Sequence, residues 1–477
     1  MGIAQSERAV GPGGGARLPA LTRAVSAGAI PHALRFRRIL EVGLFAAILI
    51  AVAGFGGTEP VTWGISESVI LLLGLLLVAR PSEHLGRGLW KLAWFPSALG
   101  AWISVQWLAS RAGRIGYDTH SIQTQGLALA AYVSAFFVAL QIASERASRK
   151  RLALFLVGLG LIEALYGLVQ YFGGWQYIWN VPRRFYIGSA TATYVNHNHF
   201  AALLEMILPL ALGLSLYHWQ AVRRGSRRRT WRSVLANIGN PDVMKCLLFL
   251  LAAAILVLAI VFSFSRMGLI SMIVSLAVMS AAILLGRRGS LAAALLFLFV
   301  LGSGASAAWV GLGPVVEHFE QLSRNEPLAG NEGRVALWRD ASLLIREHPW
   351  TGVGLGCFEH AFTRVRSVQL TYVADHAHND YLEAAAELGI PCAAILFGAF
   401  FWIAGRALQA SRVARSNLTR SLALGSLGGV TALLVHSLAD FNLHIPANAL
   451  VFAVVLGLAC AAFRDSAAPQ PNEPPSG

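Results

Sequence analysis

Residues 246–262 read CLLFLLAAAILVLAIVF, and no charged side chain interrupts this run. As a helix that rises about 1.5 Å per residue, the run comes close to crossing the ~30 Å hydrocarbon core of a membrane. Similar runs recur along all 477 residues, of which 56% are hydrophobic and 13% charged. The mean hydropathy is +0.59. Since these runs are too long and continuous for barrel strands, the sequence predicts an all-α, polytopic integral membrane protein.

The topology follows from the spacing of the apolar runs and from the basic residues between them. With the N-terminus in the cytoplasm, the inner segments hold 27 of the 38 Lys and Arg residues and the outer segments hold 11. Six of these 11 lie in the long loop at 312–377, which the positive-inside rule weights least. Both termini are therefore expected inside. We expect about 12 transmembrane helices, near 39–56, 64–79, 90–108, 125–144, 152–172, 199–217, 246–262, 267–285, 291–311, 386–405, 420–437 and 446–463.

The net charge of +14 comes from short basic tracts between the apolar runs, such as Arg227–Arg229. Membrane topology explains this placement better than a nucleic-acid-binding face does, so we expect no nucleic-acid partner. The four cysteines form neither a disulfide framework nor a CxxC metal pattern. The inner linkers hold no acid–base constellation and no glycine-rich nucleotide loop, so any chemistry is expected on the outer face.

The outer segment 183–199, RRFYIGSATATYVNHNH, leads directly into an apolar run. Arg183 and Arg184 stand at its start, and His197 and His199 stand at its end. One interpretation is anchoring at the membrane interface together with nearby aromatic side chains. Another is a polar wall that faces an anionic headgroup, and a third is a metal site that includes the two histidines.

Arg266 lies in the short sequence SFSRMG, 263–268, between two long apolar runs. Almost no loop is available to carry its charge to water, and charged residues at such depth usually face a cavity or a partner. Simple snorkelling of the side chain is one explanation. We favour an anion partner, since arginine holds phosphate through two parallel hydrogen bonds and does not lose its proton.

The long loop contains GRVALWRDASLLIREHPWTGVGLGCFEHAF, 333–362. Its apolar residues follow helical spacing, which predicts an amphipathic helix that ends at His348–Pro349. Arg334 lies at the start of this helix. The following GVGLG is typical of a turn, because no strand precedes it and a dinucleotide site needs that context. The residues that define the apolar face are Val335, Leu337, Trp338, Ala341, Leu344 and Ile345.

The sequence HAHNDYLEAAAELGIP, 376–391, is the strongest candidate for chemistry. Asn379 or Asp380 can cap a helix, which places His378 at the helix N-terminus. The partial positive charge there disfavours imidazolium, so His378 can accept a proton, and the same helix end can attract a diphosphate. A purely structural cap histidine is one alternative. A zinc site is another, formed by His376 and His378 with the histidines at 197 and 199.

Several further ionisable residues have open roles. Glu163 and Glu205 fall inside predicted spans, where a carboxylate forms a buried salt bridge or relays protons. Asp440 and His444 lie in the last outer loop. We expect His197, His199, Glu205, His376 and Arg334 to line a polar cavity.

Three parts of the sequence together resemble the O-antigen ligase/polymerase superfamily, the membrane glycosyltransferases with a Wzy-type C-terminal domain. They are TYVNHNHFAALLEMILPLALG (193–213), FSRMGL (264–269), and GRVALWRDASLLIREHPWTGVGLGCF (333–358) followed by HAHNDYLEAAAELGIP. The resemblance implies transfer of a glycan from undecaprenyl diphosphate on the periplasmic face of the bacterial inner membrane, without a metal ion or another cofactor. The acceptor is a glycan chain, lipid A-core or a protein, and membrane lipids surround the enzyme.

By position, the resemblance assigns the family's catalytic histidine to His378 and its membrane-edge arginine to Arg266. The upstream, diphosphate-binding arginine corresponds to Arg183 or Arg184. The ligase pattern continues to Gly-x-x-[Gly/Thr/Tyr], but Cys392 occupies its last position, which departs from a strict lipid A-core ligase. In the implied mechanism His378 takes the proton of an acceptor hydroxyl, and the arginines stabilise the leaving diphosphate.

The resulting domain division has five parts: a basic cytoplasmic tail (1–38), helices 1–9 (39–311), a large, partly helical periplasmic loop with the catalytic segment (312–385), helices 10–12 (386–463) and a disordered cytoplasmic tail (464–477). Two other classes of protein fit the same pattern. One is a transporter or flippase that uses the two intramembrane glutamates as proton relays, although no convincing internal repeat is present. The other is a non-catalytic scaffold, which would tolerate loss of both His378 and Arg266.

Overall fold

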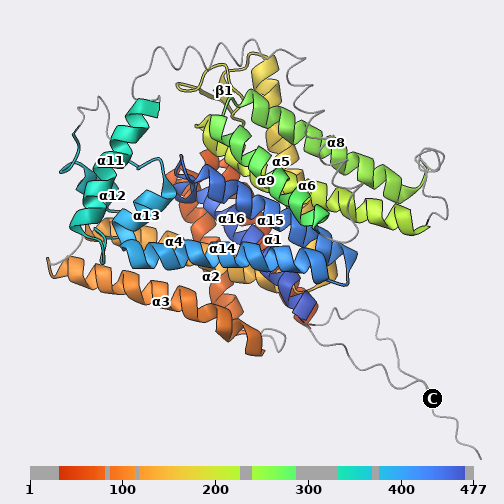
Figure 1. Cartoon of the computed structure of the whole chain (residues 1–477), viewed down its shortest axis with the longest axis horizontal. Coiled ribbons are helices and arrows are strands. Elements are labelled where there is room, and N and C mark those ends of the chain that lie inside the picture. The colour runs from red at the N-terminus through yellow and green to blue at the C-terminus, as the bar shows by residue number, and fades with distance from the viewer. Residues whose placement is uncertain are drawn as a thin grey trace, which may run out of the picture.

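The computed structural model describes residues 32–80, 86–113, 118–225, 239–285, 331–367 and 375–467. In these ranges the chain is almost entirely helical (Figure 1). Nine of the described helices are long and apolar enough to cross a membrane. They are α2 (Pro60–Ala79), α4 (Thr119–Ile142), α5 (Arg146–Phe172), α6 (His197–Gly225), α8 (Pro241–Phe262), α9 (Arg266–Leu284), α14 (Ile390–Val413), α15 (Asn417–His436) and α16 (Pro446–Ala467).

The remaining elements are shorter or more polar. Helices α1 (His32–Ala53) and α3 (Gly86–Arg111) match two further predicted spans, but their charged residues and lower hydropathy separate them from the nine. The predicted span at 291–311 lies outside the described residues. The other elements are the 3-10 turns η1 (Phe55–Gly57) and η2 (Asn442–His444), the strands β1 (Tyr177–Ile178) and β2 (Val181–Pro182), and helices α11 (Asn331–Glu347), α12 (Phe358–Phe362) and α13 (Asp380–Leu388).

The strands form a small antiparallel hairpin, in which Ile178 pairs with Val181. This hairpin lies in the segment between α5 and α6. Helices α11, α12 and α13 gather at one end of the bundle, beside α3 and α4 (Figure 1). The amphipathic helix predicted to end before His348–Pro349 is therefore confirmed as α11.

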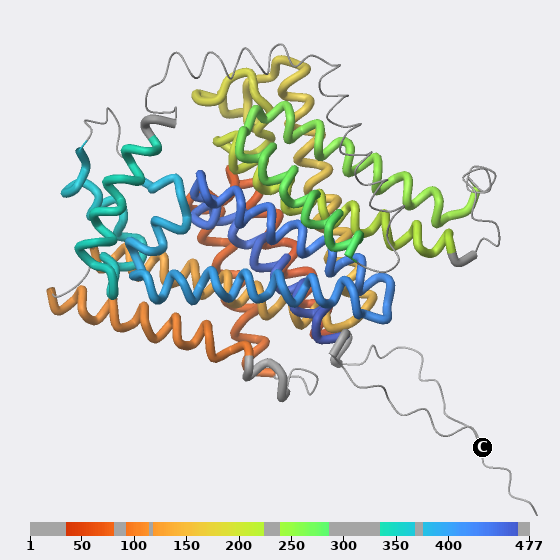
Figure 2. Tube along the Cα trace, in the orientation of Figure 1, coloured from red at the N-terminus to blue at the C-terminus, as the bar shows by residue number. Residues whose placement is uncertain are grey.

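The helices α6 and α15 form the centre of the bundle and lie side by side although they are far apart in sequence (Figure 2). Small residues let their backbones approach. A Cβ atom added at Gly213 would lie 2.5 Å from the Ser421 carbonyl oxygen, and one at Gly429 would lie 2.6 Å from the Met206 carbonyl oxygen. Close packing of this kind holds membrane helices together without a hydrophobic driving force between them. It fixes the first turns of α6 relative to the last turns of α15, where the polar residues gather.

The predicted span at 386–405 is wrong at its start. The membrane helix α14 begins at Ile390, and residues up to Leu388 belong to the separate helix α13. Gly389, which has φ 81° and ψ 154°, separates α13 from α14. The apolar, alanine-rich end of α13 hides this break in the sequence pattern. The segment between α9 and α14 therefore extends to the α13–α14 junction.

Candidate active site

Asp440 is the centre of a buried polar cluster in the turn between α15 and α16. Its Oδ1 lies 3.6 Å from His199 Nε2 and 3.7 Å from His378 Nδ1, and its Oδ2 lies 3.7 Å from His436 Nε2. Burial alone would raise the pKa of Asp440, but these imidazoles hold it well below its usual range. Asp440 is therefore a buried carboxylate that is ionised between three histidines. We call these four residues the Asp440 cluster.

The Asp440 cluster continues inward along α6 and α15. His436 Nδ1 lies 3.0 Å from Glu205 Oε1, and both side chains are fully buried. The second carboxylate oxygen of Glu205 accepts a hydrogen bond from the Ser271 hydroxyl on α9. The intramembrane carboxylate at 205 thus has a histidine partner, which the sequence alone left open.

The aromatic ring of Phe441 packs among three histidine rings on the outer side of the cluster. Its centroid lies 4.8 Å from that of His199, 4.3 Å from that of His376 and 4.8 Å from that of His378. The ring therefore separates the Asp440 cluster from a second polar group. The predicted cavity residues His199 and His376 do approach His378, but they do so around an aromatic side chain.

The second group consists of His376, Glu383 and His444. Glu383 Oε1 lies 2.6 Å from His376 Nδ1 and 3.3 Å from His444 Nε2. Burial alone would raise the pKa of Glu383, but the charges of His444 and His376 lower it to about 2. Burial would lower the pKa of His444, but Glu383 and Asp380 raise it to about 10. Each partner thus keeps the others charged.

Backbone contacts fix the position of His378. The side chain of Asn379 caps α13 by accepting hydrogen bonds from the backbone N–H groups of residues 381 and 382. The backbone N–H of Asp380 donates to the carbonyl oxygen of Ser437 at 3.0 Å, and the Ser437 hydroxyl donates to Asp380 Oδ2 at 2.6 Å. The predicted helix cap is therefore confirmed. His378, just before the cap, has φ 48°, which is unfavourable for a residue with a side chain.

The GVGLG segment at 352–356 packs against the C-terminal end of α13 through backbone hydrogen bonds. The N–H of Val353 donates to the Ala386 carbonyl oxygen at 2.8 Å, and the N–H of Gly354 donates to that of Glu387 at 3.1 Å. A Cβ atom on Gly352, which has φ 66°, would lie 2.1 Å from the Glu387 carbonyl oxygen. The turn predicted for this segment is confirmed. Its glycines allow direct contact between the backbones.

The structure distinguishes the two arginines at the start of the 183–199 segment. Arg183 is buried, and its guanidinium donates hydrogen bonds to the carbonyl oxygens of Ser189 and Tyr186. Burial also lowers the pKa of Arg183. Arg184 is exposed. Arg183 therefore organises the loop, and Arg184 faces the surroundings.

His197 joins this loop to the turn that carries Arg266. Its Nδ1 lies 2.5 Å from the carbonyl oxygen of Ser263, and its ring stacks on that of Tyr186 at 4.4 Å. Arg266 is the first residue of α9 and is exposed. Two residues along α6 from His197, His199 contacts Asp440. The start of α6 therefore connects the arginine side of the site to the histidine side.

These contacts do not support the zinc site considered for four histidines. His197 is directed to the Ser263 carbonyl and His199 to Asp440. Arg334 lies half-buried in the first turn of α11. Within the described parts of the chain, no hydrogen bond or ion pair joins Arg334 to the other predicted site residues.

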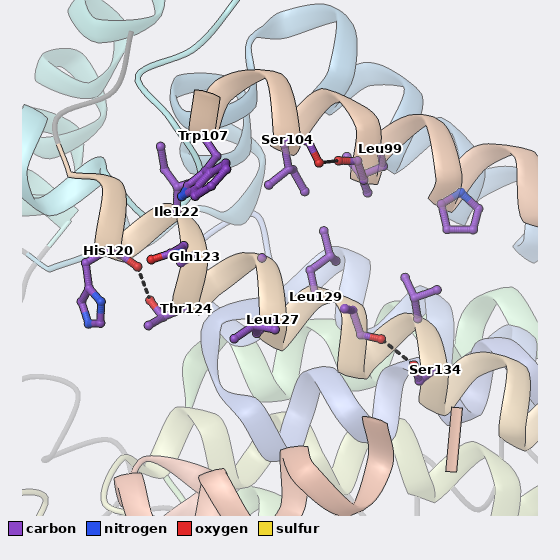
Figure 3. Close-up of a pocket in the computed structure, with 16 residues that line it drawn as sticks. Leu99, Ser104, Trp107, His120, Ile122, Gln123, Thr124, Leu127, Leu129 and Ser134 are labelled. Atoms are coloured by element: carbon purple, nitrogen blue, oxygen red, sulfur yellow. Dashed lines mark hydrogen bonds between the residues drawn. The ribbon is translucent and has the colours of Figure 1, made fainter. Parts of the chain in front are cut away.

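A cavity of about 770 Å³ lies elsewhere, between α3 and α4 (Figure 3). Its walls are mostly apolar, with Leu99, Trp107, Ile122 and Leu127 around it. None of the predicted site residues lines it. Its mostly apolar walls do not suit the acid–base chemistry of the histidines.

Residues 251–397 match the family model of O-antigen ligase. The match covers less than half of the chain, and it confirms the resemblance to the O-antigen ligase/polymerase superfamily. It runs from within α8 to within α14, so it contains Arg266, α11 and His378 but neither Arg183 nor Arg184. No curated protein matches this sequence.

Sequence reasoning missed the partners that complete the site. The sequence leaves the roles of Asp440 and His444 open and indicates no role for Glu383. His436 did carry a signal, because an ionisable residue at the end of a predicted span usually has a function or a partner. Glu383 lies on the α13 turn that follows His378, where no apolar pattern marks it.

Proposed function

We propose that this chain is a membrane glycosyltransferase of the O-antigen ligase/polymerase type, active in the biosynthesis of cell-surface polysaccharide. It transfers a glycan from undecaprenyl diphosphate to an acceptor hydroxyl on the periplasmic face of the bacterial inner membrane. The observation that carries the proposal is the apposition of His378 and buried Asp440 at 3.7 Å, next to the segment that leads to Arg266. The match to O-antigen ligase supports the same reaction class.

Asp440 determines which nitrogen of His378 is available for chemistry. The carboxylate faces Nδ1, so it favours the tautomer with the proton on Nδ1 and leaves Nε2 with a free lone pair. The His378 side chain is 36% exposed, so an acceptor can reach it. Asp440 is thus a positioning residue, and His378 is the general base.

The proposed reaction is a single displacement. The acceptor hydroxyl oxygen attacks the anomeric carbon of the donor sugar while Nε2 of His378 takes the hydroxyl proton. The bond from that carbon to the diphosphate oxygen breaks, and undecaprenyl diphosphate leaves with both bonding electrons. His378 then releases the proton to water. Direct attack inverts the configuration at the anomeric carbon, and no step uses a metal ion.

Arg266 and Arg184 are proposed to bind the leaving diphosphate. Both are exposed, on segments that His197 and Tyr186 hold together. Guanidinium groups stabilise charge that develops on phosphate oxygens, which lowers the barrier to departure. Arg183 is not available for this role because its N–H groups are directed to backbone carbonyls.

The transporter alternative relies on Glu163 and Glu205 as proton relays. Glu163 accepts hydrogen bonds from the backbone N–H and the hydroxyl of Thr193, at 3.2 and 2.9 Å. Glu205 pairs with His436. These contacts account for both buried carboxylates without transport, so we favour the enzyme.

The experiment is a transfer assay with purified protein, a lipid-linked glycan donor and separate acceptors: a glycan chain, lipid A-core and a protein. His378→Gln should abolish product, whereas the matched variant His360→Gln, at an exposed histidine on α12, should retain it. The size distribution of the product distinguishes polymerisation from a single transfer. Full activity of His378→Gln, or no product with any acceptor from a folded protein, would refute the proposal.

A further inference from the structure

We propose that His376, Glu383 and His444 form a binding site for a divalent transition-metal ion of the zinc class. One ligand atom from each residue lies within 4.8 Å of the others. Two imidazole nitrogens and one carboxylate oxygen are a donor set that suits Zn²⁺ and leaves a fourth position open. The site goes beyond the proposed transfer reaction and does not depend on it.

The distances fit a tetrahedral ion after small movements. With metal–ligand bonds of 2.0–2.1 Å, neighbouring ligand atoms in a tetrahedron lie about 3.4 Å apart. Glu383 Oε1 lies 2.6 Å from His376 Nδ1 and 3.3 Å from His444 Nε2. The Glu383–His444 separation already has the required length, the Glu383–His376 separation must widen by about 0.8 Å, and no separation, at 4.8 Å or less, must close by more than about 1.4 Å.

Neighbouring residues hold two of the three ligands through hydrogen bonds, as is usual for metal ligands. His444 Nδ1 lies 3.1 Å from Asp380 Oδ1, which turns Nε2 toward Glu383. Glu383 Oε2 accepts a hydrogen bond from the Ala377 backbone N–H at 2.8 Å, which leaves Oε1 for the site. A carboxylate behind a ligating histidine fixes its ring and increases its basicity. The contact between Asp380 and His444 is a second observation that favours a metal site, because Asp380 is not one of the three ligands.

The site is accessible from one side and rigid on the other. The side chains of His376 and His444 are 23% and 16% exposed, whereas that of Glu383 is 1% exposed. An ion can thus enter past the two imidazoles and meet a fixed carboxylate. Without an ion, protons on the imidazoles hold the same atoms together, so metal binding replaces those protons.

A bound ion would join the start of α13 to η2 across the ring of Phe441. His376 and His444 both lie close to that region, with 4.9 Å between their ring centroids. His376 precedes the proposed general base, His378, by two residues. The ion would therefore hold the segment that bears His378 against the α15–α16 turn, as a structural or regulatory element outside the transfer step.

The test is metal binding by the full-length protein in detergent, after removal of metals with a chelator. Zn²⁺ titration against a chromophoric competitor should show one tight equivalent. His444→Ala and Glu383→Gln should each weaken binding at least 100-fold, and Asp380→Asn by 10- to 100-fold. His360→Ala, at an exposed histidine outside the site, should bind as the wild type does. Absence of a stoichiometric ion in the wild type, or wild-type affinity in His444→Ala, would overturn the proposal.

A variant that keeps a ligand guards against simple misfolding. His444→Cys replaces the imidazole with a thiolate, another zinc ligand, so it should recover Zn²⁺ binding relative to His444→Ala. With Co²⁺ as the probe, it should also gain a thiolate-to-cobalt charge-transfer band that the wild type lacks. If His444→Cys is folded and shows no such band, the residue does not ligate the ion. These readouts are independent of glycan transfer, so they fail or succeed separately from the proposed function.

Discussion

Replacing His378 with glycine should slow glycan transfer by at least about 100-fold and leave the protein about as stable as before. The backbone of His378 has φ 48°, in the left-handed region. A residue with a Cβ atom costs about 1–2 kcal/mol there, and glycine does not. The effect of the substitution on activity can therefore be separated from its effect on stability.

The contacts that the variant loses are modest. The imidazole is 36% exposed, lies 3.7 Å from Asp440 and has an edge contact with Phe441. Asp440 keeps His199 and His436 at 3.6 and 3.7 Å. We assign about 1 kcal/mol to the lost contacts, which the relief of backbone strain offsets. The free energy of unfolding should therefore change by less than about 1 kcal/mol. The loss of a general base should slow transfer by about 10²- to 10⁴-fold.

Two measurements on one preparation check this prediction: initial rates with a lipid-linked donor, and thermal unfolding in the same detergent. Added imidazole should restore part of the rate in His378→Gly, because the variant leaves space beside Asp440. A rate above a tenth of the wild-type value would show that His378 is not the base. Stability lower by more than about 2 kcal/mol would show that His378 maintains the fold.

Three further predictions concern Asp440 and two matched pairs of variants. Asp440→Asn should lower kcat by about 100-fold or more with little change in KM for the donor, because it changes the tautomer of His378 and not the binding of the donor. An equal rise in KM would contradict a positioning role. Arg183→Ala should destabilise the protein by about 1–3 kcal/mol, because the buried Ser189 carbonyl oxygen loses its side-chain donor and the Tyr186 carbonyl oxygen loses one of its donors. Arg184→Ala should leave the melting temperature unchanged and raise the donor KM; melting curves and kinetics that reverse this order would refute the assignment. Gly352→Ala should destabilise the protein by more than about 2 kcal/mol, because the added Cβ atom would lie 2.1 Å from a backbone oxygen. Gly398→Ala in α14, where nothing lies within 4 Å of the added Cβ atom, should be neutral or stabilising in the same melting assay.

The membrane helices could be predicted from sequence because the length of an apolar run is itself the physical requirement for crossing lipid. Every predicted span that falls in the described residues overlaps a long helix. The error at 386–405 has a specific cause. The apolar pattern runs from α13 into α14, and the break at Gly389 depends on the backbone of Trp350, which lies far away in sequence. A Cβ atom at Gly389 would lie 2.4 Å from the carbonyl oxygen of Trp350.

The site was only partly predictable for a similar reason. Local signals marked His378 and the cap at Asn379, because a helix N-terminus is encoded by neighbouring residues. Asp440 and Glu205 acquire their roles through contacts with His378 and His436 on other elements, and no local pattern specifies such contacts. The same holds for Arg183 and Arg184. The sequence shows two equivalent arginines, and only the folded loop buries one and exposes the other.

The junction at Gly389 also ties the site to the thickness of the bilayer. The apolar part of α14, residues 390–405, has 16 residues, or about 24 Å at 1.5 Å per residue, which is shorter than a hydrocarbon core of ~30 Å. An apolar stretch that is too short for its bilayer is accommodated by local thinning of the bilayer or by snorkelling of flanking residues. Because the backbone of residues 349–354 packs against the junction, a shift of α14 in the bilayer moves α13 instead of being absorbed by a flexible hinge. We therefore expect the acyl-chain length of the surrounding lipids to affect the position of His378, so lipid composition becomes a variable of the reaction itself.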